Sequence, residues 1–163
     1  KAPLVTDLTL VFSDTQISVS NLLKFTSPYS KMRSFDMFTS LVELDCSYTD
    51  VSQINLPNLK HLVFKYTKVY DFTMLVNLEY LDCEGCPVII ITGLPKLKNL
   101  CCRKSDIQII ILPELIFLDC TETKIEILQV NKLRCLRKST NIKNKFHTDV
   151  EIDNEQIKNI CSN

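Results

Sequence analysis

The sequence lacks several features on which broad function classes depend. Nineteen basic residues balance nineteen acidic ones, which argues against a strongly basic nucleic-acid or membrane-surface binder. No run of 18 apolar residues is present, so we expect no helix that spans a bilayer. Neither an Asn-x-Ser/Thr glycosylation acceptor nor a signal-peptide pattern occurs, and Lys1 leads us to expect that residues precede the printed chain. We therefore expect no nucleic-acid partner and no membrane insertion.

Signatures of catalysis are also missing. The chain has only two histidines, His61 and His147, and His61 has no Ser or Cys nucleophile in its own strand. No catalytic triad, phosphate-binding loop or carboxylate pair in a tuned environment can be read from the residues. We therefore expect no enzymatic activity and no cofactor.

What the sequence does contain is a motif repeated at a short, nearly constant period. The pattern L-x-x-L-x-C-x-x-C-x-V-x-x-I at residues 78–91 recurs, with small changes, at residues 97–110 and 115–128. Two further complete copies occupy residues 41–54 and 59–72. Self-similarity at a fixed short period indicates a repeat architecture, in which each unit buries its apolar face against its neighbours.

Copies at the two ends of the array are less regular. Near the start we align Leu10, Phe12, Thr15 and Ile17 with the motif, although a local hairpin explains the same alternation. Residues 25–38 form a degenerate copy, in which three phenylalanines fit but two residues fall where Leu and Cys belong: Phe25, Phe35 and Phe38, against Pro28 and Ser30. Downstream, Leu133 and Leu136 keep the opening of the motif while Lys138 replaces the cysteine, so the array is expected to end there.

The motif resembles that of leucine-rich repeats, L-x-x-L-x-L-x-x-N/C-x-L, over roughly residues 8–146. Two departures are a period of only 18 or 19 residues and a different residue where Asn is typical: Thr49, Thr67, Cys86, Ser105 and Thr123. Short repeats rich in Cys and Thr are similar to those of amoebal giant viruses and protists. The resemblance implies a solenoid with a parallel sheet, whose concave outward face is the usual ligand surface.

The spacing of the motif predicts a mainly β solenoid. Each unit opens with alternating apolar and polar residues, as in a strand, and too few residues follow for a packed helix. Pro57, Pro95 and Pro113 also favour a return arm that is extended or carries short turns. We therefore predict a repeat array over residues 1–146. Residues 147–163 are predicted to form a small helical cap behind Asp153.

Most of the cysteines are expected to be core residues. Cys46, Cys83, Cys102 and Cys120 fall in one inward column, interchangeable with Phe64, so they behave as small apolar side chains with free thiols. Free thiols suit a reducing compartment, and we expect the cytoplasm, with incorporation in a virion as the alternative.

Two stretches have some features of a metal site, but neither fits one. Cys83, Cys86, Cys101 and Cys102 have a spacing that zinc could use, but the repeat frame points them in different directions, with Cys101 outward and exposed. Residues 149–153 resemble the start of an EF-hand loop, but Asn154 replaces its glycine. We expect no metal.

Partner binding is predicted on the outward face of the sheet. The predicted binding residues are Asp45, His61, Lys65, Tyr80, Asp82, Glu84, Arg103, Phe117, Asp119 and Arg137. Lys65, Glu84 and Arg103 should lie side by side on successive rungs and pair. The alternative is that these residues are merely solvated.

A second surface competes with the outward face. Ile89, Ile90, Ile109 and Ile111 add apolar residues where the frame needs none, so they predict either a packed second sheet layer or a patch for lateral association. The predicted function is a protein-interaction module. The alternative is a structural component of a larger assembly, such as a viral particle, that packs through these isoleucines.

Overall fold

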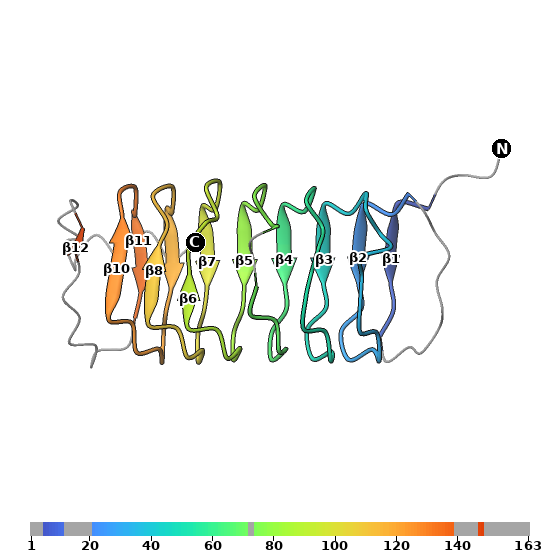
Figure 1. Cartoon of the computed structure of the whole chain (residues 1–163), viewed down its shortest axis with the longest axis horizontal. Helices are drawn as coiled ribbons and strands as arrows, with labels where there is room; N and C mark the ends of the chain where they lie inside the picture. The colour runs from blue at the N-terminus through green and yellow to red at the C-terminus, as the bar shows by residue number, and fades with distance from the viewer. Residues whose placement is uncertain (1–4, 12–20, 72–73, 139–146, 149–163) are drawn as a thin grey trace.

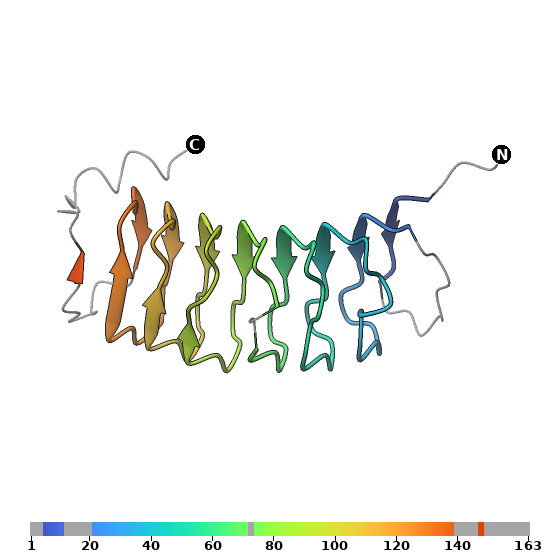
Figure 2. The same ribbon diagram turned by 45° about the horizontal axis from the view of Figure 1, so that its top comes forward.

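The computed structural model describes residues 5–11, 21–71, 74–138 and 147–148, which form a parallel β-solenoid of about seven turns. The turns follow one another in a nearly straight row (Figures 1 and 2). Successive turns contribute the strands of an eight-stranded parallel sheet. Its strands, in spatial order, are β1 (Asp7–Thr9), β2 (Lys24–Thr26), β3 (Glu43–Asp45), β4 (His61–Val63), β5 (Tyr80–Asp82), β7 (Asn99–Cys101), β9 (Phe117–Asp119) and β11 (Cys135–Arg137).

Each of these strands buries its central residue and turns its flanking residues outward, apart from the more exposed β1. Because the strands are parallel and in register, the central residues stack into one column inside the solenoid: Phe25, Leu44, Leu62, Leu81, Leu100, Leu118 and Leu136. Further inward columns are filled by Leu, Ile, Val, Phe and Cys. Burying one large apolar side chain contributes about 1.5 to 3 kcal/mol, so each turn is stabilised chiefly by stacking on its neighbours.

The frame of the first two copies differs from the prediction. Leu8 pairs with Phe25, which pairs with Leu44, so Leu8 and not Leu10 takes the central strand position. The prediction aligned Phe25 with the first leucine of the motif. In the structure Phe25 pairs with Leu44, the second leucine of its copy, so the alignment of residues 25–38 shifts by three residues. Phe12, Thr15 and Ile17 lie outside the described residues.

An aromatic cluster explains why the second copy is hard to align. The Phe25 ring packs edge-on against Phe35 at 5.7 Å and Phe38 at 5.2 Å between centroids. Buried Ser27 follows Phe25 at the position where other copies carry Cys or Phe, and buried Ser30 lies at the position where they carry Thr, Cys or Ser. Phenylalanines therefore fill this turn where other turns use smaller residues.

A tight turn follows each strand from β3 to β9 of the large sheet. The hydroxyl of Thr49 donates to the carbonyl of Cys46 at 2.7 Å, and Ser105 and Thr123 do the same to Cys102 and Cys120. These side-chain hydrogen bonds hold the bend of each turn. Cys86 differs, because its thiol donates to the Phe64 carbonyl of the preceding turn at 3.1 Å.

The return arm is extended and carries short turns, as predicted. Pro57, Pro95 and Pro113 each occupy the second position of a four-residue turn closed by a backbone hydrogen bond, a position that proline favours. In the second half of the chain the arm forms a four-stranded parallel sheet, ordered β6 (Ile90–Ile91), β8 (Ile109–Ile111), β10 (Ile127–Val130) and β12 (His147–Thr148).

The predicted helical cap is not supported by what the structure describes. His147 and Thr148 continue the return-arm sheet, because they pair with Gln129 and Val130, and residues 149–163 lie outside the described residues. The described part of the chain has no helix, and hence none that could cross a membrane.

Candidate functional site

The outward face of the eight-stranded sheet carries two columns of side chains, one at each end of the strands. The first column contains Lys24, Glu43, His61, Tyr80, Asn99, Phe117 and Cys135. The second contains Thr26, Asp45, Val63, Asp82, Cys101, Asp119 and Arg137. Seven of the ten predicted binding residues lie in these columns. The other three, Lys65, Glu84 and Arg103, lie two residues beyond their strands.

Those three residues form the centre of an ion-pair network, as expected from the repeat frame. Glu84 lies between Lys65, at 3.6 Å, and Arg103, at 3.0 Å, and Lys104 approaches it at 3.8 Å. Lys65 also reaches Asp82 at 3.0 Å. The pKa of Lys65 is raised, because its hydrogen bond to Asp82 and the neighbouring carboxylates together outweigh the opposing effect of burial.

Three aspartates in the second column close the ends of their strands. Asp45, Asp82 and Asp119 each accept a hydrogen bond from the backbone N–H two residues ahead, at 3.0 to 3.2 Å. This side-chain bond imitates a backbone turn. Asp82 and Asp119 are only 5% exposed, so they hold the face in shape and offer a partner little surface.

Cys101 lies on the outward face but is not exposed, contrary to the prediction. It sits in register between Asp82 and Asp119 and is 9% exposed. Burial raises the pKa of its thiol, and the Asp82 carboxylate raises it further. The expectation failed because the charged side chains around the thiol, those of Asp82, Asp119 and Arg103, leave it little contact with solvent.

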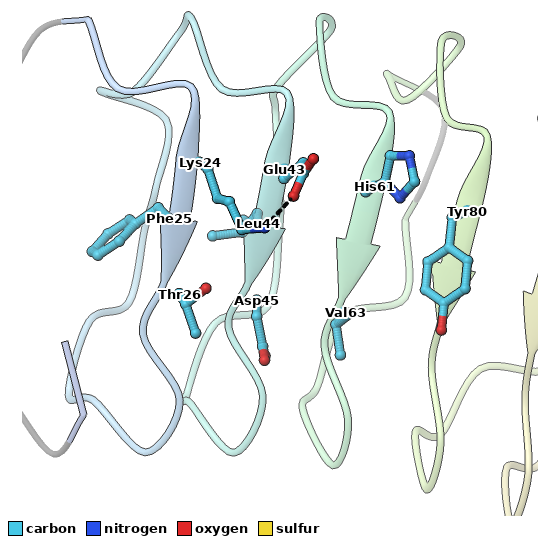
Figure 3. Close-up of a pocket in the computed structure, with 9 residues that line it drawn as sticks. All are labelled: Lys24, Phe25, Thr26, Glu43, Leu44, Asp45, His61, Val63 and Tyr80. Carbon is cyan, nitrogen blue, oxygen red and sulfur yellow. Dashed lines mark ion pairs between the residues drawn. The ribbon is translucent and has the colours of Figure 1, made fainter. Parts of the chain in front are cut away.

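A shallow cavity of about 230 Å³ opens on the outward face near its N-terminal end (Figure 3). It crosses β2 to β5, and its side chains include Asp45, Val63 and the stacked pair His61 and Tyr80, whose ring centroids are 5.8 Å apart. Lys24 lines it too and pairs with Glu43 at 2.8 Å. At the other end of the face, the Arg137 guanidinium lies over the Phe117 ring at 5.6 Å.

A row of tyrosines beside the face was not foreseen. Tyr29, Tyr48 and Tyr66 occupy the same turn position on three successive turns, and their rings stack at 4.5 and 5.1 Å between centroids. All three have φ near +55° and are more than 40% exposed. A positive φ is uncommon outside glycine. Their spacing of 19 and 18 residues, which matches the repeat, was the available signal.

The inward cysteines are deeply buried, as expected. Burial raises the pKa of the Cys46, Cys83 and Cys102 thiols well above the ordinary value, and that of Cys120 to about 12. Cys86 lies at its turn, so the four cysteines considered for zinc occupy three different environments. Among the described residues, no three His, Cys, Asp or Glu side chains group to hold a metal.

Cys135 differs from the other described cysteines, since it is disulfide-bonded.

The predicted isoleucine patch lies on the return-arm sheet. Ile89 and Ile90 are about half exposed, Ile111 is 38% exposed, and Ile109 is partly buried. Ile127, which the prediction missed, is in register with Ile109 and extends the strip. The alternating partners Ile91, Ile110 and Leu128 point into the core. The apolar surface is therefore contiguous along β6, β8 and β10.

Similarity to known proteins is found at the level of the fold. No family model matches the sequence, and no curated protein matches it. Two solved structures of Listeria monocytogenes internalins, which are leucine-rich repeat proteins, are similar to it. The functional domain of InlJ, described as including a cysteine ladder, aligns with a TM-score of 0.60 at 20% identity, over 93% of this chain and 42% of that one. InlF aligns with a TM-score of 0.51 at 16% identity, over 87% and 55%.

The chain thus spans about half, or less, of the internalin chains it matches. The likeness places it among leucine-rich-repeat solenoids in fold. The narrower resemblance to repeats of amoebal giant viruses and protists stays a prediction.

Proposed function

We propose that this chain is a non-enzymatic interaction module that binds a protein partner through the outward face of its eight-stranded sheet. The observation that carries the proposal is the cavity over β2 to β5, where the stacked rings of His61 and Tyr80 adjoin Asp45. Aromatic side chains on a rigid surface, surrounded by charge, are typical of the residues that dominate binding energy in protein interfaces. The fold shared with internalins supports the same role.

The network around Glu84 supports the proposal in a second way. Its ion pairs fix Lys65 and Arg103 in place before a partner arrives. A surface whose long side chains are already ordered loses less conformational entropy on binding. The outward face is therefore preorganised over its central turns.

A capture experiment with matched variants tests the proposed face. Wild-type protein, a His61→Ala/Tyr80→Ala variant and an Ile90→Lys/Ile111→Lys variant are immobilised and exposed to the same extract. We expect the wild type and the isoleucine variant to retain the same partner, and the outward-face variant to lose it. Retention by the outward-face variant, or capture of no partner by the wild type, would overturn the proposal.

The exposed isoleucines favour a second function, as a component of a larger assembly. Contiguous exposed apolar side chains are the kind of surface through which proteins associate, and β6 adds an edge of the return-arm sheet. If this surface mediates assembly, light scattering should show concentration-dependent association that Ile90→Lys abolishes and His61→Ala leaves intact. A wild-type monomer at every concentration would exclude self-association through this surface.

For the location of the protein, we propose a reducing, intracellular compartment. Six described cysteines are free, and all six are buried, which supports this location. The disulfide at Cys135 weighs against it. Counting free thiols in protein taken directly from its source decides the matter, since a reducing location predicts that all eight cysteines of the sequence react after denaturation.

A further inference from the structure

The three aspartates of the outward face are chemically alike but not equally neutralised. Asp82 pairs with Lys65 at 3.0 Å, and the side chain of Arg103 approaches Asp119 at 3.9 Å. In both cases the cation comes from the preceding turn, two residues beyond its strand. The repeat therefore has one position that supplies a positive charge to the aspartate of the next turn.

At Asp45 that position is occupied by Pro28. Pro28 lies two residues beyond β2, as Lys65 does beyond β4, and β2 pairs with β3 in the same register. Among the described residues, Asp45 makes no ion pair. Its Oδ1 accepts hydrogen bonds from the backbone N–H of Ser47 at 3.0 Å and from the Ser47 hydroxyl at 2.7 Å.

The one lysine among the described residues that line the cavity is already engaged. Lys24 shares the cavity with Asp45, but its ammonium group pairs with Glu43 at 2.8 Å, as the dashed line in Figure 3 marks. This hydrogen bond raises the pKa of Lys24 and lowers that of Glu43. With Lys24 and Glu43 cancelling, the cavity keeps the single negative charge of Asp45.

The surroundings of Asp45 suit a long, flat cation. Val63 lies next to Asp45 in the same column, and the stacked His61 and Tyr80 rings lie in the neighbouring column (Figure 3). A guanidinium group is planar, weakly hydrated and able to stack on aromatic rings, whereas an ammonium group is compact and strongly hydrated. Aromatic faces also attract cations directly.

We propose that the cavity receives an arginine side chain of the partner protein, whose guanidinium pairs with Asp45 where the repeat lacks its own cation. The methylene groups of that arginine lie over Val63, toward His61 and Tyr80. This inference rests on the proposed function and names the chemistry that the outward face recognises.

The test uses two short peptides that differ in one group. Acetyl-Gly-Arg-Gly-amide and its citrulline analogue, which is nearly isosteric but uncharged, are titrated into the ¹⁵N-labelled full chain. We expect the arginine peptide to shift the amide signals of Asp45, Val63 and Tyr80. The citrulline peptide should bind at least tenfold more weakly. Equal binding of the two peptides would overturn the proposal.

Three variants locate the site. Asp45→Asn keeps an acceptor for Ser47 but removes the charge, and Pro28→Lys supplies the missing cation from within the repeat, as Lys65 does for Asp82. Both substitutions should lower the affinity for the arginine peptide at least tenfold. Asp50→Asn removes an exposed carboxylate paired with Lys68 elsewhere and should change nothing. Unchanged binding to Asp45→Asn, in protein with native amide signals, would also overturn the proposal.

The outcome separates this inference from the proposed function. If a partner is captured through the outward face but Asp45→Asn retains it fully, the face is correct and the arginine site is wrong. If the arginine peptide binds at Asp45 but no partner depends on His61 and Tyr80, the site is real and the proposed function is wrong. A lysine peptide that binds as tightly as the arginine peptide would reject the choice of guanidinium.

Discussion

The ring of Tyr66 covers the Cα of Gly85 on the next turn so closely that a Cβ on residue 85 would collide with it. Gly85 occupies the same turn position as Tyr29, Tyr48 and Tyr66, and like them it has a positive φ. The row of stacked rings ends against a glycine because a side chain there would displace the last ring.

Gly85→Ala should therefore destabilise the protein more than Gly93→Ala. Both glycines have a positive φ, of 68° and 75°, but a Cβ on Gly93 meets nothing within 4 Å. Gly93→Ala should cost about 1 to 2 kcal/mol, the backbone cost of a left-handed conformation. Gly85→Ala adds the displacement of the Tyr66 ring. Urea unfolding measures both, and in a Tyr66→Ala background the two costs should become equal.

The buried thiols predict a loss of stability at alkaline pH. The pKa values of Cys46, Cys83 and Cys102 are raised well above the ordinary value, and that of Cys120 to about 12. Thiols therefore ionise first in the unfolded chain, near pH 9. Their stabilising contribution is complete below that pH and is lost as the pH rises toward the folded values. Each thiol adds a slope of about 1.4 kcal/mol per pH unit.

Denaturant unfolding at pH 8 and pH 9.5, with reductant present, tests this expectation. Cys102→Val removes one thiol while keeping an apolar side chain, so its stability should fall less steeply with pH than that of the wild type. Identical slopes for the two proteins would show that Cys102 ionises as readily in the folded state as in the unfolded state.

Glu84 should stabilise the fold more than an exposed acidic residue of the same type. Its carboxylate is 13% exposed and accepts a hydrogen bond from Arg103 at 3.0 Å, with Lys65 and Lys104 nearby. Glu84→Gln should cost about 1.5 to 3 kcal/mol, as expected for hydrogen bonds to a charged group.

Glu114→Gln is the matched control. Within the described ranges Glu114 pairs only with Lys132, at 2.7 Å, and both side chains are over 40% exposed. Such a pair contributes about 0 to 1 kcal/mol. The difference between the two substitutions should narrow in 1 M salt, and equal costs at low salt would mean that the network adds nothing to a simple surface pair.

Cys101 should react slowly with a bulky thiol reagent, in spite of its place on the outward face. Its thiol is covered, and burial raises its pKa, so little of the reactive thiolate is present near neutral pH. Peptide mass spectrometry after timed labelling gives the rate for each cysteine. Ser52→Cys, at an exposed position, supplies a reference thiol. If Cys101 is modified as fast as that reference, its neighbours do not cover it.

The sequence predicted the central turns well because every inward position there carries an apolar side chain. From Leu41 to Leu128 the register follows directly from that pattern. Around Phe25 the register could not be predicted in this way, since Phe25 replaces the leucine and Ser27 replaces the cysteine of the motif. Alignment of the repeats fails where different side chains fill the same volume.

The candidate site was predicted only in outline. The alternation of strands places Asp45, Asp82 and Cys101 on one face, but it does not give their exposure. The exposure of each side chain depends on whether a long neighbouring side chain covers it, as Lys65 covers Asp82. The tyrosine row requires a positive φ, which tyrosine seldom adopts, so residue preferences could not predict it. Its only signal in the sequence was the spacing of the three tyrosines, which matches the repeat.

The stacked tyrosines also give the molecule a built-in optical signal. The chain has five tyrosines and no tryptophan, so its near-ultraviolet absorption and emission come mainly from tyrosine. Three of the five chromophores lie face to face on adjacent turns, where their electronic transitions couple and excitation passes from ring to ring. Near-ultraviolet circular dichroism and fluorescence anisotropy will therefore report on the turns that carry Tyr29, Tyr48 and Tyr66. Melting of this end of the solenoid can thus be followed separately from the loss of the sheet as a whole.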